Sequence, residues 1–349
     1  MRHLYKVEIF GRNYQYKDMA LLSELSIQMD YLTLENTTLT VVDLAADKGD
    51  FVHVTDFYGV IIHQGIVLDV AREGNRAKLK VAPLLSLLDV QVQYDKAIFQ
   101  SKPLEDCISK IITDTYISNA DSLQNIAGIE VEQESSTPGT PLDIRSNIHA
   151  FWDIITKALT LYDIVVQARL EPQSKKIFFT IGKVSGKIAL EAQLGNCLAH
   201  NFVLTDNYGT LNKITFVNKD NENEKAIYYL HPSGAIDRKD ENRITPVLFS
   251  AEYIQGAEDF LKEAYSRAYE QMTPEKYQQC IELSFREDDR MVSPNQIHIG
   301  QLAEIWYQDK RYTSVMTGYS REKGVVTLVF GCIRLELTKK LILSRRQEG

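Results

Sequence analysis

Three consecutive acidic side chains, Glu287, Asp288 and Asp289, have the clearest catalytic potential in this sequence. A pair of carboxylates at a suitable separation can act as general acid and base, or as acid and nucleophile, on a glycosidic bond. Acidic residues that precede a turn are more commonly a solvated surface feature. A cell-wall hydrolase is therefore an alternative that rests on this cluster alone.

Two other stretches imitate ligand-binding loops. Gly182, Gly186 and Lys187 resemble part of a phosphate-binding loop, but they lie one residue too close together, and Ile188 stands where a Ser or Thr would hold magnesium. The polar and acidic residues of 218–224 alternate as in a calcium loop, but they lack its central glycine and closing glutamate. We expect no nucleotide site at the first stretch and a solvated hairpin turn at the second.

No catalytic motif accompanies these residues. The sequence has no HExxH, GxSxG, Walker A or GxGxxG pattern, and none of its seven histidines lies at ligand spacing from another. The cysteines are isolated, which favours reduced core residues over a metal site or disulfide framework: Cys107, Cys197, Cys280 and Cys332. We therefore expect no catalytic, cofactor-binding or metal-binding residues, no cofactor and no enzymatic activity.

The composition is that of a folded protein with more than one domain. A chain of 349 residues, 44% of them hydrophobic and 25% charged, is long for a single core, so two to four domains are expected. The net charge of -8 and the lack of a stripe dense in Lys and Arg argue against a protein that binds nucleic acid through its phosphates. The basic residues of 339–349 are expected to form a solvated tail.

Nothing in the sequence predicts secretion or membrane insertion. Residues 1–10 are polar and strand-like, without the apolar core of a signal peptide, and no apolar run approaches the length of a membrane span. We expect synthesis in the cytoplasm, export only as part of an assembly, and no membrane anchor.

A pattern of three strands occurs twice. Residues 49–81 and 300–331 each begin at a glycine and contain three runs rich in β-branched and aromatic residues, separated by tight turns. Gly65 and Gly318 lie in the second run of each copy, and the hairpin that follows is expected to be longer in the early copy. We interpret the copies as an internal duplication with one strand order; a chance resemblance between two ordinary meanders is the alternative.

The first half of the chain divides into strands and helices. Alternating residues in 1–98 predict about six short strands in a small, closed or nearly closed β-barrel, which removes exposed edges. Residues 99–195 are expected to form an α+β domain of two helices and a hairpin. The first helix follows Pro103, and the second carries the apolar stripe of 148–162 after Ser146, with Trp152 in the core.

The strands resume after residue 195 and are interrupted once. Residues 196–231 and 276–338 are expected to form a second β-barrel, with a helical insertion of residues 232–275 at one end. The helix of the insertion is predicted to run from Ser250 and to carry Ile254 and Met272 on one face. The predicted fold class is α+β, mainly β: two similar small β-barrel domains with an intervening α+β domain and a helical insertion.

This organisation resembles the baseplate hub proteins of phage tails, the family of the T4 gene 27 product and of the N-terminal hub region of siphophage tail-associated proteins. Besides the two barrels, the resemblance rests on these residues: Phe151, Trp152 and Asp153 in the second helix, and Gly300, Tyr312, Gly318 and Gly331 before a Lys-rich end. Many siphophage relatives continue into a peptidoglycan hydrolase or a fibre, whereas this sequence ends at Gly349. Any lytic or receptor-binding activity is then expected on a separate chain.

The resemblance implies a structural function in the virion. Such hubs are trimers whose two barrels per chain form a pseudo-sixfold ring, so that a threefold tip can continue a sixfold tail tube. The implied partners are the tail tube or distal tail protein, the tape measure protein, and a spike or fibre protein. A trimer with three times the charge of -8 would suit a lumen through which DNA passes without specific binding.

A baseplate receptor or carbohydrate-binding protein is the alternative from another class. It would need a cluster of exposed aromatic residues on loops. Most of the 18 tyrosines lie instead within strand or helix periods.

Overall fold

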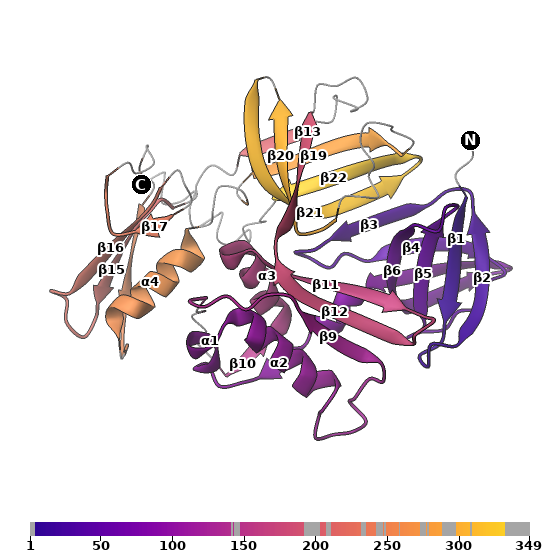
Figure 1. Ribbon diagram of the computed structural model, residues 1–349, viewed down its shortest axis with the longest axis horizontal. Helices are drawn as coiled ribbons and strands as arrows, with labels where there is room; N and C mark the ends of the chain where they lie inside the picture. Colours follow the sequence, from indigo (N-terminus) through magenta and orange to yellow (C-terminus); the bar gives the residue numbers. More distant parts are fainter. Residues whose placement is uncertain are drawn as a thin grey trace.

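The structure is a computed structural model of the 349-residue chain. It describes residues 4–140, 142, 147–191, 203–206, 211–231, 235–241, 247, 249–257, 259–272, 277, 279–287, 298–307 and 309–331. These residues form five sheets that lie around two helical regions (Figure 1).

The N-terminal residues form a curved six-stranded sheet, with the order β2-β1-β5-β6-β7-β4, around a core of its own (Figure 1). The strands are β1 (Tyr5–Phe10), β2 (Tyr16–Leu22), β4 (Thr37–Val42), β5 (Phe51–Asp56), β6 (Ile61–Glu73) and β7 (Arg76–Pro83). Apolar residues alternate inward, as the pattern in β4 and β7 predicted. The sheet is a half-barrel. Within the described residues no ladder joins the end strands β2 and β4, so a closed barrel is not formed.

The strand β3 (Ser26–Asp30) leaves this sheet. It pairs antiparallel with the second half of β21 (Lys310–Glu322), from Ser26 opposite Glu322 to Asp30 opposite Gly318. Tyr31 continues the contact by donating its backbone N–H to the carbonyl of Thr317 at 2.8 Å. The strand that could have helped to close the first barrel thus belongs to a second sheet.

That second sheet has seven strands in the described residues, in the order β13-β20-β21-β22-β19-β14 with β3 beside β21. Its other strands are β13 (Ser185–Glu191), β14 (Val203–Asp206), β19 (Gln279–Arg286), β20 (Gln301–Tyr307) and β22 (Val325–Gly331). β13 lies within the residues 99–195 that were predicted as the α+β domain, yet it pairs in parallel with β20. The sheet boundary therefore falls before residue 185.

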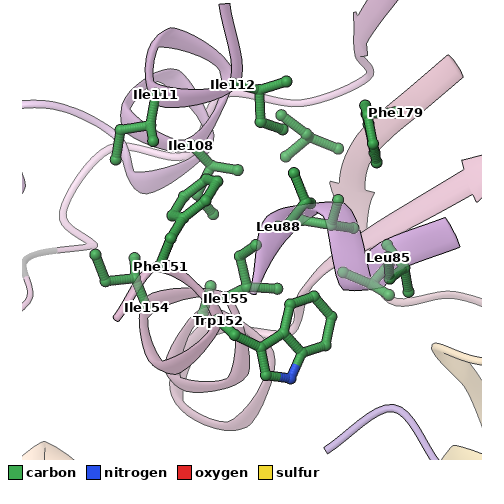
Figure 2. Close-up of a cluster of buried hydrophobic side chains, with 14 of the residues drawn as sticks. Leu85, Leu88, Ile108, Ile111, Ile112, Phe151, Trp152, Ile154, Ile155 and Phe179 are labelled. Atoms are coloured by element: carbon green, nitrogen blue, oxygen red, sulfur yellow. The ribbon is translucent and has the colours of Figure 1, made fainter. Parts of the chain in front are cut away.

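Three α-helices, one 3-10 helix and two small sheets form the centre of the molecule around the largest core, shown in Figure 2. Its elements are η1 (Leu84–Leu88), β8 (Gln91–Gln93), α1 (Ile98–Ser101), α2 (Leu104–Tyr116), β9 (Ile129–Gln133), β10 (Ile148–Ala150), α3 (Phe151–Tyr162), β11 (Ile164–Glu171) and β12 (Lys176–Lys183). Figure 2 shows Phe151 and Trp152 of α3 on the side that faces Ile108 of α2 and Leu88 of η1. Trp152 is a core residue, as predicted.

The second helix begins later than its apolar pattern predicted. Ile148 lies in β10 with an exposed side chain, and the residue that caps α3 is Ala150. The predicted cap, Ser146, lies outside the described residues. Ile148 pairs with Gln93 in the ladder between β10 and β8, so it is part of a strand and not of the helix.

The insertion is larger than predicted and contains its own sheet. β15 (Lys213–Asn218), β16 (Lys225–Leu230), β17 (Ile236–Asp237) and β18 (Phe249–Ile254) pair in the order β17-β16-β15-β18, and α4 (Phe260–Gln271) packs on them. The segments 213–218 and 225–230, predicted for the second barrel, belong here. Ile254 ends a strand and does not start the helix, because 249–254 pairs in parallel with β15. α4 begins after Asp259, whose carboxylate accepts from the N–H of Lys262 at 3.1 Å.

One expectation about the cysteines is wrong. Cys107 is free and buried, but Cys280 is disulfide-bonded. None of the described helices is long and apolar enough to cross a membrane.

Candidate assembly surfaces

The acidic cluster singled out in the sequence includes a residue that holds two sheets together. Glu287 accepts a hydrogen bond from the hydroxyl of Tyr5 and forms an ion pair with Arg321, and both Glu287 and Arg321 are almost completely buried. Asp288 and Asp289 lie outside the described residues. Since Tyr5 belongs to β1 and Arg321 to β21, Glu287 joins the two large sheets.

Neither loop-like stretch forms a ligand loop. Gly182 lies in β12 and Gly186 in β13, and Lys187 forms an ion pair with Glu304 at 2.7 Å. Residues 218–224 form the hairpin turn between β15 and β16, closed by the N–H of Asn218 donating to the carbonyl of Glu224 at 3.0 Å. No group of three or more His, Cys, Asp or Glu residues with the geometry of a metal site occurs among the described residues.

The internal duplication is visible in the strand ladders. The order β5-β6-β7-β4 recurs as β20-β21-β22-β19, as the sequence predicted for the first three strands. The registers of the β6–β7 and β21–β22 ladders also agree: Val67 pairs with Val81 and Met316 with Phe330, and in both ladders one residue of the long strand is then skipped. Both ladders end at a two-residue turn, but Gly65 lies further from its turn than Gly318 does. The hairpin that follows the glycine is therefore longer in the early copy, as predicted.

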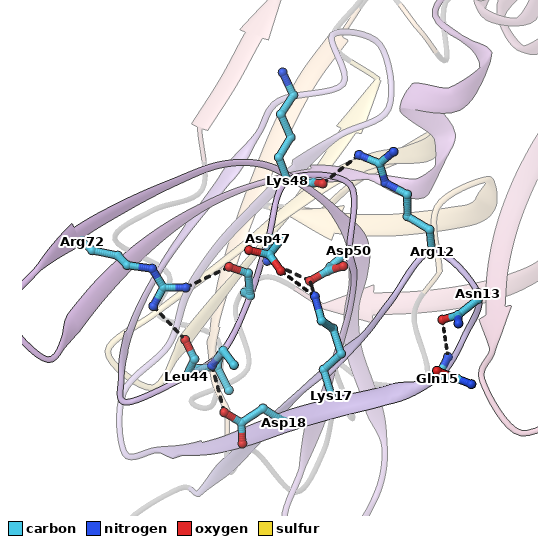
Figure 3. Close-up of polar contacts among 12 residues, drawn as sticks. Arg12, Asn13, Gln15, Lys17, Asp18, Leu44, Asp47, Lys48, Asp50 and Arg72 are labelled. Carbon is cyan, nitrogen blue, oxygen red and sulfur yellow. Dashed lines mark hydrogen bonds and ion pairs between the residues drawn. The ribbon is translucent and has the colours of Figure 1, made fainter.

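The turn before β5 carries a hydrogen-bond pattern of its own (Figure 3). The N–H of Asp50 donates to the carbonyl of Asp47 at 3.1 Å, and the carboxylate of Asp50 accepts from the N–H of Asp47 at 2.8 Å. The N–H of Gly49, a residue with φ of 90°, donates to the carbonyl of Val67 at 2.7 Å. Lys17 points at this turn and forms ion pairs with both aspartates.

The turn before β20 repeats this pattern with different side chains. The N–H of Gln301 donates to the carbonyl of His298 at 3.1 Å, and the amide oxygen of Gln301 accepts from the N–H of His298 at 3.2 Å. The N–H of Gly300, with φ of 82°, donates to the carbonyl of Met316 at 2.9 Å. A chance resemblance between two meanders would not reproduce three hydrogen bonds and a bulge, so the structure supports duplication.

The two glycines within the long strands are not equivalent. The ladders align Gly318 with Asp69, and Gly65 with Ser314. A Cβ on Gly65 would lie 2.2 Å from the carbonyl oxygen of Ala82, whereas a Cβ on Gly318 would lie 2.7 Å from that of Met29 in β3. Each glycine permits a different close backbone approach, so the sequence pairing of these two positions is wrong.

The repeat also explains the position of Glu287. Its N–H donates to the carbonyl of Gly324 at 2.9 Å, just as the N–H of Asp43 donates to that of Asn75 at 2.8 Å, and in both copies the acceptor is the second residue of the two-residue turn. Glu287 and Asp43 are therefore counterparts. Glu287 is nearly buried in an ion pair with Arg321, whereas its counterpart Asp43 in the early copy is exposed.

A cavity of about 340 Å³ lies where the two large sheets meet the central sheet. Its mostly apolar lining includes Ile62, Leu85, Val166 and Leu328. His63 also lines it, is buried, and has no hydrogen-bond partner for either ring nitrogen among the described residues. Burial lowers the pKa of His63 to about 4, so the ring is neutral near pH 7. No carboxylate appears among the described residues of the lining.

The tip of the β5–β6 hairpin presents aromatic side chains to solvent. Phe57 and Tyr58 are 76% and 81% exposed and lie edge to face, with ring centroids 5.6 Å apart. The carboxylate of Asp56 holds the tip by accepting from the N–H groups of Tyr58 and Val60 at 2.9 and 2.8 Å. The corresponding β20–β21 tip is two residues shorter, so this aromatic pair has no counterpart in the repeat. Sequence reasoning missed this feature, although two aromatic residues directly before Gly59 in a hairpin turn are a usable signal.

The chain resembles known proteins in its structure and not in its sequence. No family model and no curated protein matches the sequence. The structure is similar to that of a tail protein from Neisseria meningitidis, with a TM-score of 0.57 and 12% identity over 94% of this chain and 97% of that one. A prophage tail protein from Listeria monocytogenes gives a TM-score of 0.56 and 12% identity over 99% and 100%. A prophage tail protein from Shewanella oneidensis gives 0.56 and 11% over 93% and 98%. The chain therefore has the fold of phage and prophage tail proteins over almost its full length.

Proposed function

We propose that this chain is the structural hub of a phage or phage-derived tail tip or baseplate. Three copies would form a ring in which each chain contributes two related β units, giving six similar positions around a channel. The ring joins the tail tube to the tip, contacts the tape measure protein, and docks a spike or fibre protein. Its place is the tail of the virion.

The observation that carries this proposal is the duplication of β4–β7 as β19–β22 with the same register, bulge and entry turn. Two units in one chain offer related surfaces that can meet head to tail, and such contacts close only at particular rotations. The similarity to solved tail proteins supports the same class of assembly. The net charge of -8 per chain favours passage of DNA without binding.

Particle microscopy of assembled tails tests the proposal. We expect three copies of this chain in one ring at the tip, with both β units around the channel. Six copies in the ring, or one β unit of each chain outside it, would contradict the threefold hub. The isolated chain can be monomeric without affecting this test, because neighbouring tail proteins raise the local concentration.

A receptor- or carbohydrate-binding function is the second candidate, because Phe57 and Tyr58 supply an exposed aromatic pair on a loop. Aromatic rings of this kind can stack on a sugar face. Binding to host wall glycans that disappears in the F57S/Y58S variant would favour this candidate. Loss of tip-protein docking in the same variant, without any glycan binding, would favour the hub.

A further inference from the structure

One edge of the early unit carries no paired strand among the described residues, whereas the matching edge of the late unit carries β3. In the late unit, β3 pairs with Gly318 to Glu322 on the edge of β21 opposite β22. The repeat aligns these residues with Asp69 to Glu73 of β6. Within the described residues no strand pairs with this part of β6 on the edge opposite β7. We name this edge of residues 69–73 the β6 slot.

The exposure of matching residues shows the difference. Thr317 and Arg321 are buried beside β3, with 2% and 5% exposed, while their counterparts Leu68 and Arg72 are exposed. Arg72 donates to the carbonyls of Leu44 and Ala46, so its guanidinium is held back toward the preceding loop (Figure 3). Every residue of the β6 slot except the half-buried Val70 is exposed.

The backbone of the slot has the polarity of an unpaired edge. The two-residue turn after Glu73 makes Glu73 and Arg76 a hydrogen-bonded pair. In an antiparallel ladder the backbone groups of successive residues point to opposite edges, so the N–H and C=O groups of Val70 and Arg72 point away from β7. No backbone hydrogen bond from a described loop reaches Val70 or Arg72. An unpaired strand edge can serve as a template for a strand from another chain.

The repeat also identifies the strand that fits. β3 comes before β4 in the chain and lies beside it, and β14 lies beside β19, the counterpart of β4. β3 uses the edge that faces away from β4 to pair with β21. β14 is the last strand of its sheet, and the edge that faces away from β19 is unpaired among the described residues. We infer that β14 of one copy pairs antiparallel with the β6 slot of the next copy, as β3 pairs with β21 within one chain. This inference rests on the proposed head-to-tail ring and names the contact that closes it.

One side chain limits the register. Gly318 has no Cβ, and a Cβ there would lie 2.7 Å from the carbonyl oxygen of Met29 in β3. Its counterpart Asp69 has a Cβ, so the incoming strand must diverge at Asp69 and pair with Val70 to Glu73. The contact between copies is therefore shorter than the contact within the chain.

Hydrogen exchange on assembled tail tips tests the pairing. The amides of Val70 and Arg72 are expected to exchange more slowly in the ring than in the isolated chain, while that of Ala71, already facing β7, serves as an internal control. V70P removes the donor that faces the slot, and V70T keeps it. We expect V70P to lower ring yield about tenfold relative to V70T, the effect of losing roughly one backbone hydrogen bond and its alignment. Equal melting temperatures of the two isolated variants would show that V70P folds.

A photo-crosslinking residue at Arg72 in assembled tips identifies the occupant. Cross-links to residues 203–206 of another copy support the inference. Cross-links to a different tail protein, or to another segment of a second copy, would overturn it. Three copies in a ring with unchanged exchange at Val70 would also overturn it while leaving the hub function in place; a copy number other than three would instead refute the hub.

Discussion

At the scale of single residues, the buried polar groups of this chain serve the junction between its sheets. Tyr5, Glu287 and Arg321 connect β1 to β21, and the hydroxyl of Tyr319 donates to the carbonyl of Ile62 at 2.8 Å. The hydroxyl of Tyr31 accepts from the N–H of Val166 at 3.0 Å and joins β3 to the central sheet. These bonds hold the units in one orientation.

His63 makes the stability of the chain depend on acid. Its pKa is about 4 when folded and near 6.5 when unfolded, so the unfolded state takes up the proton first as pH falls. The neutral buried ring stabilises the fold fully above pH 6.5, and roughly 3 kcal/mol of this is lost by about pH 4. Urea unfolding of H63L should show a flatter decline than the wild type over this range. H298Q, at an exposed position on the same cavity, should keep the wild-type decline.

Removing Glu287 should destabilise the fold. E287A leaves Arg321 as a charge in a nearly closed environment, and breaking such a pair costs about 3 kcal/mol. Thermal unfolding measures the loss, and D43N, at the exposed counterpart position whose φ of 49° Asn also tolerates, should change stability little. Wall-clearing activity in the wild type that vanishes in E287Q without loss of stability would contradict the structural role.

The aromatic tip should matter for docking and not for folding. F57S/Y58S removes two exposed rings while Asp56 continues to hold the turn, so the melting temperature should stay within about one degree of the wild type. Pull-down of the tip complex from assembled tails should weaken. T55S, which alters a neighbouring buried residue in β5, is the control for general effects on the hairpin.

At the scale of elements, the pairing of β3 with β21 is the contact on which both units depend. G318A would place a Cβ 2.7 Å from the backbone of β3, and the resulting shift should cost about 1–3 kcal/mol. G324A is a control with open space around the Cβ, although its φ of 75° adds its own backbone strain. Hydrogen exchange should show faster opening of β3 in G318A only.

Local sequence patterns predicted most strands and α2 well, because in these segments the apolar periodicity and the turn residues indicate the same element. Leu104, Cys107, Ile108, Ile111 and Ile112 are all buried on α2, and β11 and β12 form the predicted hairpin, with its turn between Glu171 and Lys176. Long-range pairing escaped prediction. Nothing local to Ile27 shows that β3 joins β21, and Ile254 fits a helical stripe until its ladder with β15 is known. The division at residues 98 and 99 stays a prediction.

The exposed pair Phe57 and Tyr58 and the cavity beside His63 were also beyond sequence reasoning. An aromatic residue in a strand-rich stretch is usually buried, so only the position of the turn separates a tip from a core residue. The cavity is lined by elements as far apart in sequence as β3, β11 and β22, and its existence depends on how three sheets meet. Glu287 was weighed as a catalytic acid or a solvated surface acid, whereas its side chain is nearly buried. Its partners could not be read from the sequence: Tyr5 comes from the other large sheet, and Arg321 lies on β21, two strands from β19.

At the scale of the whole molecule, the insertion has its own core. Ile214, Phe216, Ile254 and Ala264 belong to a cluster separate from those of the large sheets, and Figure 1 shows β15–β17 and α4 to one side of the molecule. F216A should cost about 3–5 kcal/mol within this unit. Hydrogen exchange should rise across β15, β16, β18 and α4 while β5–β7 stay protected. Equal deprotection of β5–β7 would show instead that the chain unfolds as one unit.

The pairing of β3 with β21 has a consequence for synthesis. A ribosome makes Gly318 to Glu322 long after Ser26 to Asp30, with a delay on the order of tens of seconds at bacterial elongation rates. During that time β3 waits without its partner, with Ile27 and Met29 ready to join any other strand edge. A nascent chain of this design needs protection on the ribosome, and its yield should respond to the supply of chaperones more than the stability of the finished protein would suggest.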